Sequence, residues 1–193
     1  MAGKLDGKRI AILATDGVEQ VELTRPRDAV TQEGARTEIV SLTEGEIQAM
    51  NGDIEPADRF TVDRSIKDVS ADDYDAVLMP GGTVNADRLR MDQDVVAFVQ
   101  DVFRAGKPVG VICHGPWTLV EADLVRGRTL TSYPSLRTDI RNAGGNVVDK
   151  EVVTDNGLVS SRNPDDLPAF CAKVVEEFAE GAHRVHDEGA TVQ

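Results

Sequence analysis

The sequence predicts a doubly wound α/β sandwich, in which helices cover both faces of a mostly parallel β-sheet. Two observations predict it. Short segments such as residues 9–14 (RIAILA) and 75–79 (DAVLM) are apolar without alternation, as in strands that are buried on both faces. Longer amphipathic segments follow them, and this β–α alternation is typical of parallel sheets covered by helices.

The predicted elements alternate along the chain, and residue types suited to helix ends mark their limits. Gly34 and Gly106 end the first two long helices, because glycine adopts the conformation that closes a helix. Asn163 is a suitable N-cap for the last helix. Strands are expected at residues 9–14, 37–41, 75–79, 108–113, 147–148, 151–154 and 158–161, and helices at 22–33, 92–105, 114–124 and 164–181.

Length and composition indicate one domain. The chain has 193 residues, of which 40% are hydrophobic, so it is long enough to bury a substantial core. We expect this domain to cover residues 1–181. Residues 182–193 are polar, and we expect them to form a flexible C-terminal tail.

The charge disfavours two classes of partner. The formal net charge is −13, and such a surface repels nucleic acid and anionic lipid. The acidity fits a neutral or cationic small substrate, and it equally fits a role in solubility alone. No apolar run approaches the roughly 18 residues that a membrane span needs, and the first ten residues lack a signal-peptide core. We therefore expect a cytoplasmic protein.

The two cysteines differ in setting. They do not make a disulfide framework, and in a reducing compartment both thiols stay free. Cys171 belongs to one helix face directed at the core, so we interpret it as packing. That face comprises Leu167, Phe170, Cys171, Val174, Val175 and Phe178.

Cys113 ends an apolar strand, and Gly115 and Pro116 follow at once. Glycine permits a sharp turn, and proline suits the first turn of a helix. This arrangement is typical of a nucleophile elbow, which exposes a side chain above the sheet. Residues 15–22 and 80–90 are expected as loops at the same edge, where ligands bind to such sheets.

We expect the Cys113 thiol to be exposed and partly ionised near neutral pH. A helix N-terminus lowers an ordinary thiol pKa of about 8.5 by roughly one unit. An imidazolium lowers it further, and His114 is the candidate. The alternative is an inert cysteine buried at the end of its strand.

At this point the sequence resembles a known family, the PfpI family of intracellular cysteine proteases. That family lies in the superfamily of the parkinsonism-associated deglycase and the class I glutamine amidotransferase-like domains. The order and spacing of the matching segments extend over roughly residues 8–180. They are VEL (21–23), MPGG (79–82), ICHGP (112–116), TSYP (131–134) and SSR (160–162) followed by Pro164.

The resemblance implies a three-layer, flavodoxin-like sandwich that assembles into dimers or hexamers. It implies Cys113 as the nucleophile and His114 as its partner. An acidic residue from a neighbouring subunit orients the histidine in such proteins, and Asp87 matches it here. The family usually has glutamate there, and this loop is one residue longer, so a solvated loop carboxylate is the alternative.

Glu22 matches the acidic residue that lies beside the thiol across the superfamily. Burial would keep Glu22 neutral and able to donate a hydrogen bond; otherwise it is an ordinary residue of the first helical turn. Glu19, in the same loop, is interpreted as surface charge. Gly81 and Gly82 follow a buried strand, and their N–H groups can form an oxyanion hole or simply a tight turn.

Four other residues have weaker assignments. Tyr133 and Arg162 belong to the matching segments, and each is expected to line the pocket or an interface, or else to cap local structure. His183 and His186 are either a metal pair or surface residues, and we favour the surface. No metal site and no cofactor are expected, and the distal His–Glu pair of the amidotransferases is absent.

The resemblance therefore implies a cysteine-dependent hydrolase that acts on peptides or on dicarbonyls and their adducts, with a role in stress protection. The peptidase, the deglycase and the glyoxalase alternatives stay open. The site is expected near a subunit interface of a homo-oligomer. The alternative is a redox-sensing or chaperone-like stress protein in which Cys113 is oxidised.

Overall fold

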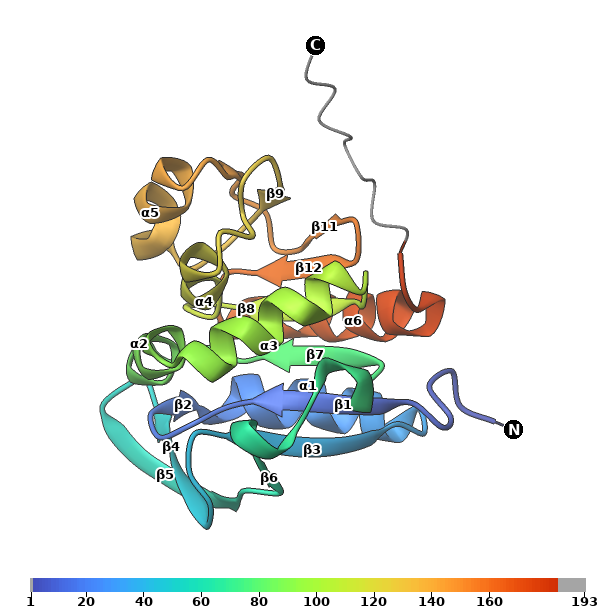
Figure 1. Cartoon of the computed structure of the whole chain (residues 1–193). Coiled ribbons are helices and arrows are strands. Elements are labelled where there is room, and N and C mark those ends of the chain that lie inside the picture. The colour runs from blue at the N-terminus through green and yellow to red at the C-terminus, as the bar shows by residue number, and fades with distance from the viewer. Residues whose placement is uncertain (1, 184–193) are drawn as a thin grey trace.

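A seven-stranded sheet forms the middle layer of the computed structural model, which describes residues 2–183 (Figure 1). The strand order is β11-β12-β8-β7-β1-β3-β6, and every pair is parallel except β11 with β12. The predicted fold class is confirmed. The strands are β1 (Arg9–Leu13), β3 (Arg36–Ser41), β6 (Arg64–Ser65), β7 (Ala76–Met79), β8 (Val109–Ile112), β11 (Val153–Asp155) and β12 (Leu158–Ser161).

Helices cover both faces of this sheet. Two of them, α1 (Gln20–Gln32) and α6 (Leu167–Glu180), pack on one face. The opposite face is covered by α3 (Gln93–Arg104), α4 (Pro116–Glu121) and α5 (Arg137–Asn142). Asn163 caps a short 3₁₀ turn, Pro164–Asp166, that leads into α6.

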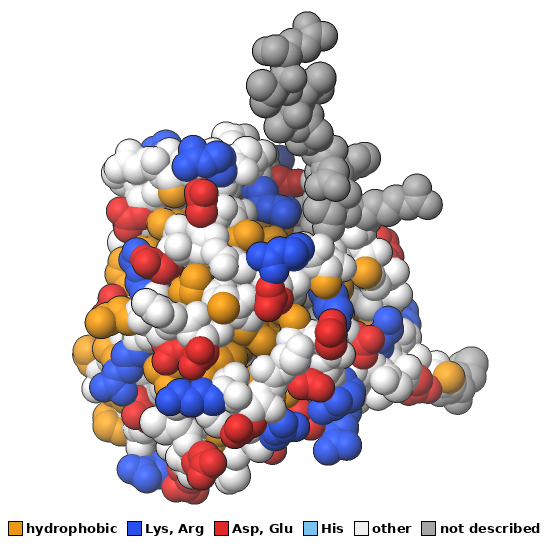
Figure 2. Space-filling model, viewed as in Figure 1, with side chains coloured by type: hydrophobic (Ala, Val, Ile, Leu, Met, Phe, Trp, Pro, Cys, Tyr) orange, Lys and Arg blue, Asp and Glu red, His pale blue; other side chains and the backbone are white. Residues whose placement is uncertain are grey.

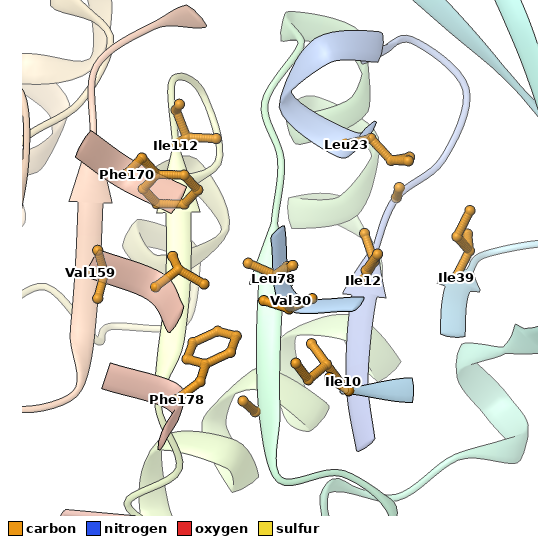
Figure 3. Close-up of a cluster of buried hydrophobic side chains, with 14 of the residues drawn as sticks. Ile10, Ile12, Leu23, Val30, Ile39, Leu78, Ile112, Val159, Phe170 and Phe178 are labelled. Carbon is orange, nitrogen blue, oxygen red and sulfur yellow. The ribbon is translucent and has the colours of Figure 1, made fainter. Parts of the chain in front are cut away.

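The core explains why the strands lack alternation. In β1, Ile10 and Ile12 face α1 and α6, whereas Ala11 and Leu13 face the opposite helices, and all four are fully buried. Figure 3 shows the first of these two layers, where Phe170 of α6 approaches the sheet. Because both faces are covered, every position along such a strand is apolar.

Two features were not predicted. Residues 46–61 form a hairpin of β4 (Glu46–Asn51) and β5 (Glu55–Thr61), and β2 (Val18–Glu19) pairs with β4. Most of β5 is exposed, so it carries no apolar signal. Residues 80–90 were expected as a loop, but most of them belong to α2 (Thr83–Met91). Its amphipathic pattern is weak because Asn85 lies among its three buried residues.

A two-stranded sheet of β9 (Thr129–Leu130) and β10 (Asn146–Val147) completes the strands of residues 2–183. The carboxyl ends of β1, β7 and β12 point to the edge where α2, β4 and β5 lie (Figure 1). Loops and elements from distant parts of the sequence therefore meet there.

His183, near the start of the predicted tail, contacts the rest of the fold. The backbone N–H of His183 donates to the carbonyl of Gly106 at 2.8 Å. Residues 184–193 of that tail, including His186, lie outside the described residues. No helix among the described residues is long and apolar enough to cross a membrane.

Charged groups of both signs share the face over which α3 runs. Figure 2 shows Lys and Arg side chains interspersed with Asp and Glu around hydrophobic side chains in the middle of this face. The exclusion of nucleic acid and membrane partners stays a prediction.

Phe170 provides a test of the core. Its ring is 1% exposed, so Phe170→Ala should lower the free energy of unfolding by about 3–5 kcal/mol. Met91→Ala is the control, because Met91 is 77% exposed and its loss should cost less than about 0.5 kcal/mol. Urea denaturation followed by circular dichroism measures both. Equal losses would contradict the packing described for α6.

Candidate active site

Cys113 lies between β8 and α4 in a strained backbone conformation. Its φ is 63°, in the left-handed region that side chains other than glycine rarely adopt. Two hydrogen bonds hold it there: its N–H donates to the carbonyl of Ser161 at 3.1 Å, and its carbonyl accepts from Tyr133 at 3.0 Å. Strain of this kind costs about 1–3 kcal/mol and is typical of functional sites.

Gly115 has a different role from the predicted one. Its φ of −51° is helical, so the sharp turn falls at Cys113 rather than at the glycine. A Cβ on Gly115 would lie 2.6 Å from Cγ2 of Val111 and 2.7 Å from the carbonyl oxygen of Met79. Glycine is therefore needed for the close approach of α4 to β7 and β8. Pro116 occupies the start of α4 as predicted.

His114 is the neighbour of the sulfur. Its Nδ1 lies 3.2 Å from Sγ of Cys113, and its side chain is buried. The imidazole stacks on Tyr133 with ring centroids 4.5 Å apart, and it meets Trp117 edge-on at 5.5 Å. These two aromatic contacts fix the plane of the ring. Tyr133 is 38% exposed, so it borders the mouth of the site.

The other ring nitrogen of His114 contacts two hydroxyl groups that the sequence analysis missed. Nε2 lies 3.3 Å from Oγ1 of Thr83 and 3.4 Å from Oγ of Ser135. Thr83 in turn donates its hydroxyl to Asp53 at 2.9 Å. The pair Asn51-Gly52 is a turn signal for a hairpin, and it was the one sequence clue to this segment.

Glu22 lies in the first turn of α1 and is 1% exposed. Its Oε2 accepts the N–H of Gly81 at 2.8 Å. Burial is the main cause that raises the pKa of Glu22 from an ordinary 4.5 to about 8, against the opposing hydrogen bond from Gly81. At neutral pH the carboxyl is therefore largely protonated.

The thiol of Cys113 is less open than expected. The residue is 6% exposed, and burial raises the pKa of its thiol, with the charge of an ionised Glu22 as the second cause. The backbone N–H groups of Gly82 and His114 hydrogen-bond the sulfur and oppose this shift of the pKa. A preformed, exposed thiolate is thus not supported. The thiol instead needs a base, and Nδ1 of His114 is beside it.

The two glycines of the predicted oxyanion hole have separate roles. The N–H of Gly81 is engaged by Glu22, so it is not free for an oxyanion. Its missing side chain matters more, since a Cβ there would lie 2.4 Å from Glu22 Oε2 and 2.6 Å from Cys113 Cβ. The N–H groups of Gly82 and His114 are the remaining donors.

Three other predicted residues lie apart from the sulfur. Asp87 is exposed on α2 and, within residues 2–183, its side chain makes no hydrogen bond or salt bridge. Arg162 pairs with Asp166, the residue before α6, at 2.8 Å and with Asp149 at 2.9 Å, so its guanidinium is engaged by these two carboxylates. His183 lies 3.6 Å from Glu177.

Glu19 is more than surface charge. Its carboxylate accepts the N–H groups of Gly52 at 3.1 Å and Asp53 at 3.4 Å. It therefore anchors the tip of the β4–β5 hairpin beside the site.

A group of side chains that could hold a metal ion lies away from the cysteine. Among the described residues, the one group that brings three potential ligand atoms together consists of Glu177, Glu180 and His183, at the end of α6. Cys113, His114 and Glu22 are not part of it. The side chains gathered at the sulfur are an imidazole and a carboxyl group.

Known proteins match the chain over most of its length. Residues 8–177 match the model of the DJ-1/PfpI family. Protein/nucleic acid deglycase 2 of Escherichia coli is 43% identical over 164 residues, which cover 84% of this chain and 93% of that protein. General stress protein 18 of Bacillus subtilis is 43% identical over 166 residues, covering 85% and 94%.

The fold matches solved structures as well. A two-domain protein from Anabaena variabilis, with DJ-1/ThiJ/PfpI-like and ferritin-like domains, superposes with a TM-score of 0.82 at 31% identity. The match covers 88% of this chain and 47% of the Anabaena chain, so this chain spans about half of that protein.

Glu22→Gln tests the protonation of the buried carboxyl. Because the pKa of Glu22 is raised to about 8 in the folded protein, the folded state binds a proton that the unfolded state releases above about pH 4.5. The stability of the wild type should therefore fall, relative to the variant, as pH rises from about 5 to 8, by up to about 1.4 kcal/mol per unit.

Urea denaturation of both proteins across this range measures the difference. A difference that does not change with pH would show that Glu22 is ionised in the folded state. The side-chain volume is conserved in this variant, so packing alone does not produce a pH-dependent difference.

Proposed function

The chain belongs to the DJ-1/PfpI family, and on that premise we propose that it is a cysteine hydrolase whose substrates are small dicarbonyl compounds and their early adducts. The observation that carries the proposal is the geometry at Cys113. The sulfur lies at a strained turn, 3.2 Å from a histidine nitrogen and against two backbone N–H groups. A nucleophile, a base and oxyanion donors are the parts that acyl and carbonyl chemistry needs.

The reaction begins with general-base activation. Sγ of Cys113 attacks the carbonyl carbon while the thiol proton moves to Nδ1 of His114. The carbonyl oxygen becomes an oxyanion and accepts hydrogen bonds from the N–H groups of Gly82 and His114. For a 1,2-dicarbonyl, addition at the aldehyde gives a hemithioacetal, and a proton shift between the two carbons converts it to a thioester. Water then releases a hydroxy acid and the thiol.

Burial favours a slender substrate. Cys113 is 6% exposed and His114 5% exposed, so a folded protein does not reach the sulfur. A small carbonyl compound does, and a short unfolded peptide is the largest substrate that fits this access. The name of the Escherichia coli relative supports the deglycase alternative. A reducing compartment such as the cytoplasm keeps the thiol in its active form.

We further propose that the protein is a homo-oligomer in which Asp87 approaches the site of a neighbouring copy. Asp87 is exposed on α2, close along the chain to Thr83. Within its own subunit, the nitrogens of His114 face Cys113, Thr83 and Ser135 instead. A role for Asp87 in catalysis therefore requires a second copy.

Cys113→Ala tests the enzymatic proposal. Removal of the nucleophile should lower turnover of methylglyoxal and of a methylglyoxal-glycated thiol by at least about 100-fold, because covalent catalysis is lost. Cys171→Ala is the matched control, since Cys171 is half-buried on α6 and packs against the core. Product formation is measured as lactate, and a fluorogenic peptide is assayed in parallel. Equal rates for wild type and Cys113→Ala would contradict the proposal.

A second function is favoured by the contact between Glu22 and the sulfur. A protonated carboxyl beside Cys113 stabilises a sulfinate by donating to its oxygen, as a redox sensor requires. Mild peroxide treatment should then add two oxygens to Cys113 in the wild type and markedly less in Glu22→Ala. Peptide mass spectrometry measures the adduct. Its absence from wild type would exclude the sensor.

A further inference from the structure

The β4–β5 hairpin brings an acidic side chain to the site from a segment far from Cys113 in the sequence. Asp53, at the hairpin tip, accepts the backbone N–H of Thr83 at 2.7 Å with Oδ1 and its hydroxyl at 2.9 Å with Oδ2. The tip is fixed by Glu19. The φ of Asp53 is 67°, a left-handed conformation that these contacts maintain.

The directions of these hydrogen bonds follow from the number of protons. An ionised carboxylate only accepts, so the single hydroxyl proton of Thr83 points to Asp53. Oγ1 of Thr83 therefore has only lone pairs to offer to Nε2 of His114, 3.3 Å away. Thr83 then favours the tautomer that carries the ring proton on Nε2, and Oγ of Ser135, 3.4 Å away, can accept from the same N–H. Nδ1 is left with a lone pair that faces Sγ of Cys113 at 3.2 Å.

We infer that Asp53, acting through Thr83 within the same chain, is the positioning residue that holds His114 in the tautomer able to take the proton of Cys113. When Sγ gives its proton to Nδ1, the ring becomes an imidazolium with both nitrogens protonated. Nε2 keeps its proton and donates it to Oγ1 of Thr83, and the carboxylate of Asp53 compensates the new positive charge. The proposal rests on the hydrolase function proposed above and adds an acidic partner that needs no second subunit.

Other groups around His114 do not replace this partner. The hydroxyl of Ser135 can accept from or donate to Nε2, so it does not select a tautomer, and it brings no charge. Glu22 lies on the side of the sulfur, and it is largely protonated at neutral pH. Several charged and titratable side chains of the described residues face the ring or its contacts. Cys113 lies at Nδ1, with Glu22 on the far side of the sulfur, and Tyr133 lies on the ring face. Asp53 and Glu19 lie behind Thr83, and Arg90 lies beyond Trp117.

Two other roles are distinguishable from this one. Asp53 also caps the first turn of α2 through the N–H of Thr83, which by itself is a structural role. Asparagine caps a helix as well as aspartate does, so Asp53→Asn removes the charge and keeps the cap. The second possibility is that Asp87 of a neighbouring copy is the acidic partner, and Asp87→Asn makes the same change of charge on α2.

The experiment follows the alkylation of Cys113 by iodoacetamide against pH, with peptide mass spectrometry to separate it from Cys171. Asp53→Asn and Thr83→Val should each slow alkylation at pH 7 by about 10-fold, and should shift the profile to higher pH by about one unit. Thr83→Ser keeps the hydroxyl and should behave as wild type. Asp94→Asn, which removes an exposed carboxylate from α3 away from the site, should leave the profile unchanged.

The tautomer is read directly by ¹⁵N NMR of the imidazole, with His114 assigned by comparison with His114→Gln. The wild type should show a bare Nδ1 and a protonated Nε2, and Thr83→Val should lose that preference. Unchanged tautomer and profile in Thr83→Val and Asp53→Asn, or a shift in Asp87→Asn instead, would overturn the proposal. Absence of turnover with the tautomer shift intact would reject the hydrolase function and leave the positioning role.

Discussion

The left-handed backbone at Cys113 is the constraint on which the site depends. The sheet holds the residue from one side through Ser161 of β12, and the segment after β9 holds it from the other side through Tyr133. The cost of this conformation, about 1–3 kcal/mol, is offset by the burial of β8 between two layers of helices. The turn places the sulfur beside Glu22 of α1, Gly82 before α2 and His114 before α4, so chemistry at Cys113 depends on the packing of the whole sheet edge.

Burial sets the protonation states of the three side chains in this site, and it acts differently on an acid and on a base. Glu22 is buried without a cation, so burial raises its pKa and keeps its proton. His114 is also buried, which lowers the pKa of its ring, while the charge of Asp53 raises it. A neutral acid on one side of the sulfur and a neutral base on the other allow the thiol to remain protonated at rest. The nucleophile is then generated when the substrate arrives, and a buried charge is not maintained between turnovers.

The hairpin of β4 and β5 shows how a peripheral element contributes to the centre. It lies outside the main sheet, and its second strand is mostly exposed, but Ile47 and Ala49 of β4 are buried in the core. It also delivers Asp53 to Thr83, with Glu19 fixing the tip. Ile54, next to Asp53, is 81% exposed, so this part of the hairpin stands at the surface above the site rather than inside the fold.

The sequence by itself determined the layered sheet, a turn from strand to helix within residues 113–116 and the nearness of His114, since apolar runs and an adjacent Gly-Pro pair are local signals; it placed the sharp turn at Gly115, and the structure moves it to Cys113. The burial of Glu22 was considered only through a resemblance. Tertiary structure alone decided three matters: that Asp53 from an unpredicted hairpin reaches Thr83, that Gly81 gives its N–H to Glu22, and that the thiol is enclosed rather than exposed. Each depends on segments that meet only when the sheet closes. Hydrogen-bond direction and desolvation are set by such neighbours, and no short window of sequence contains them.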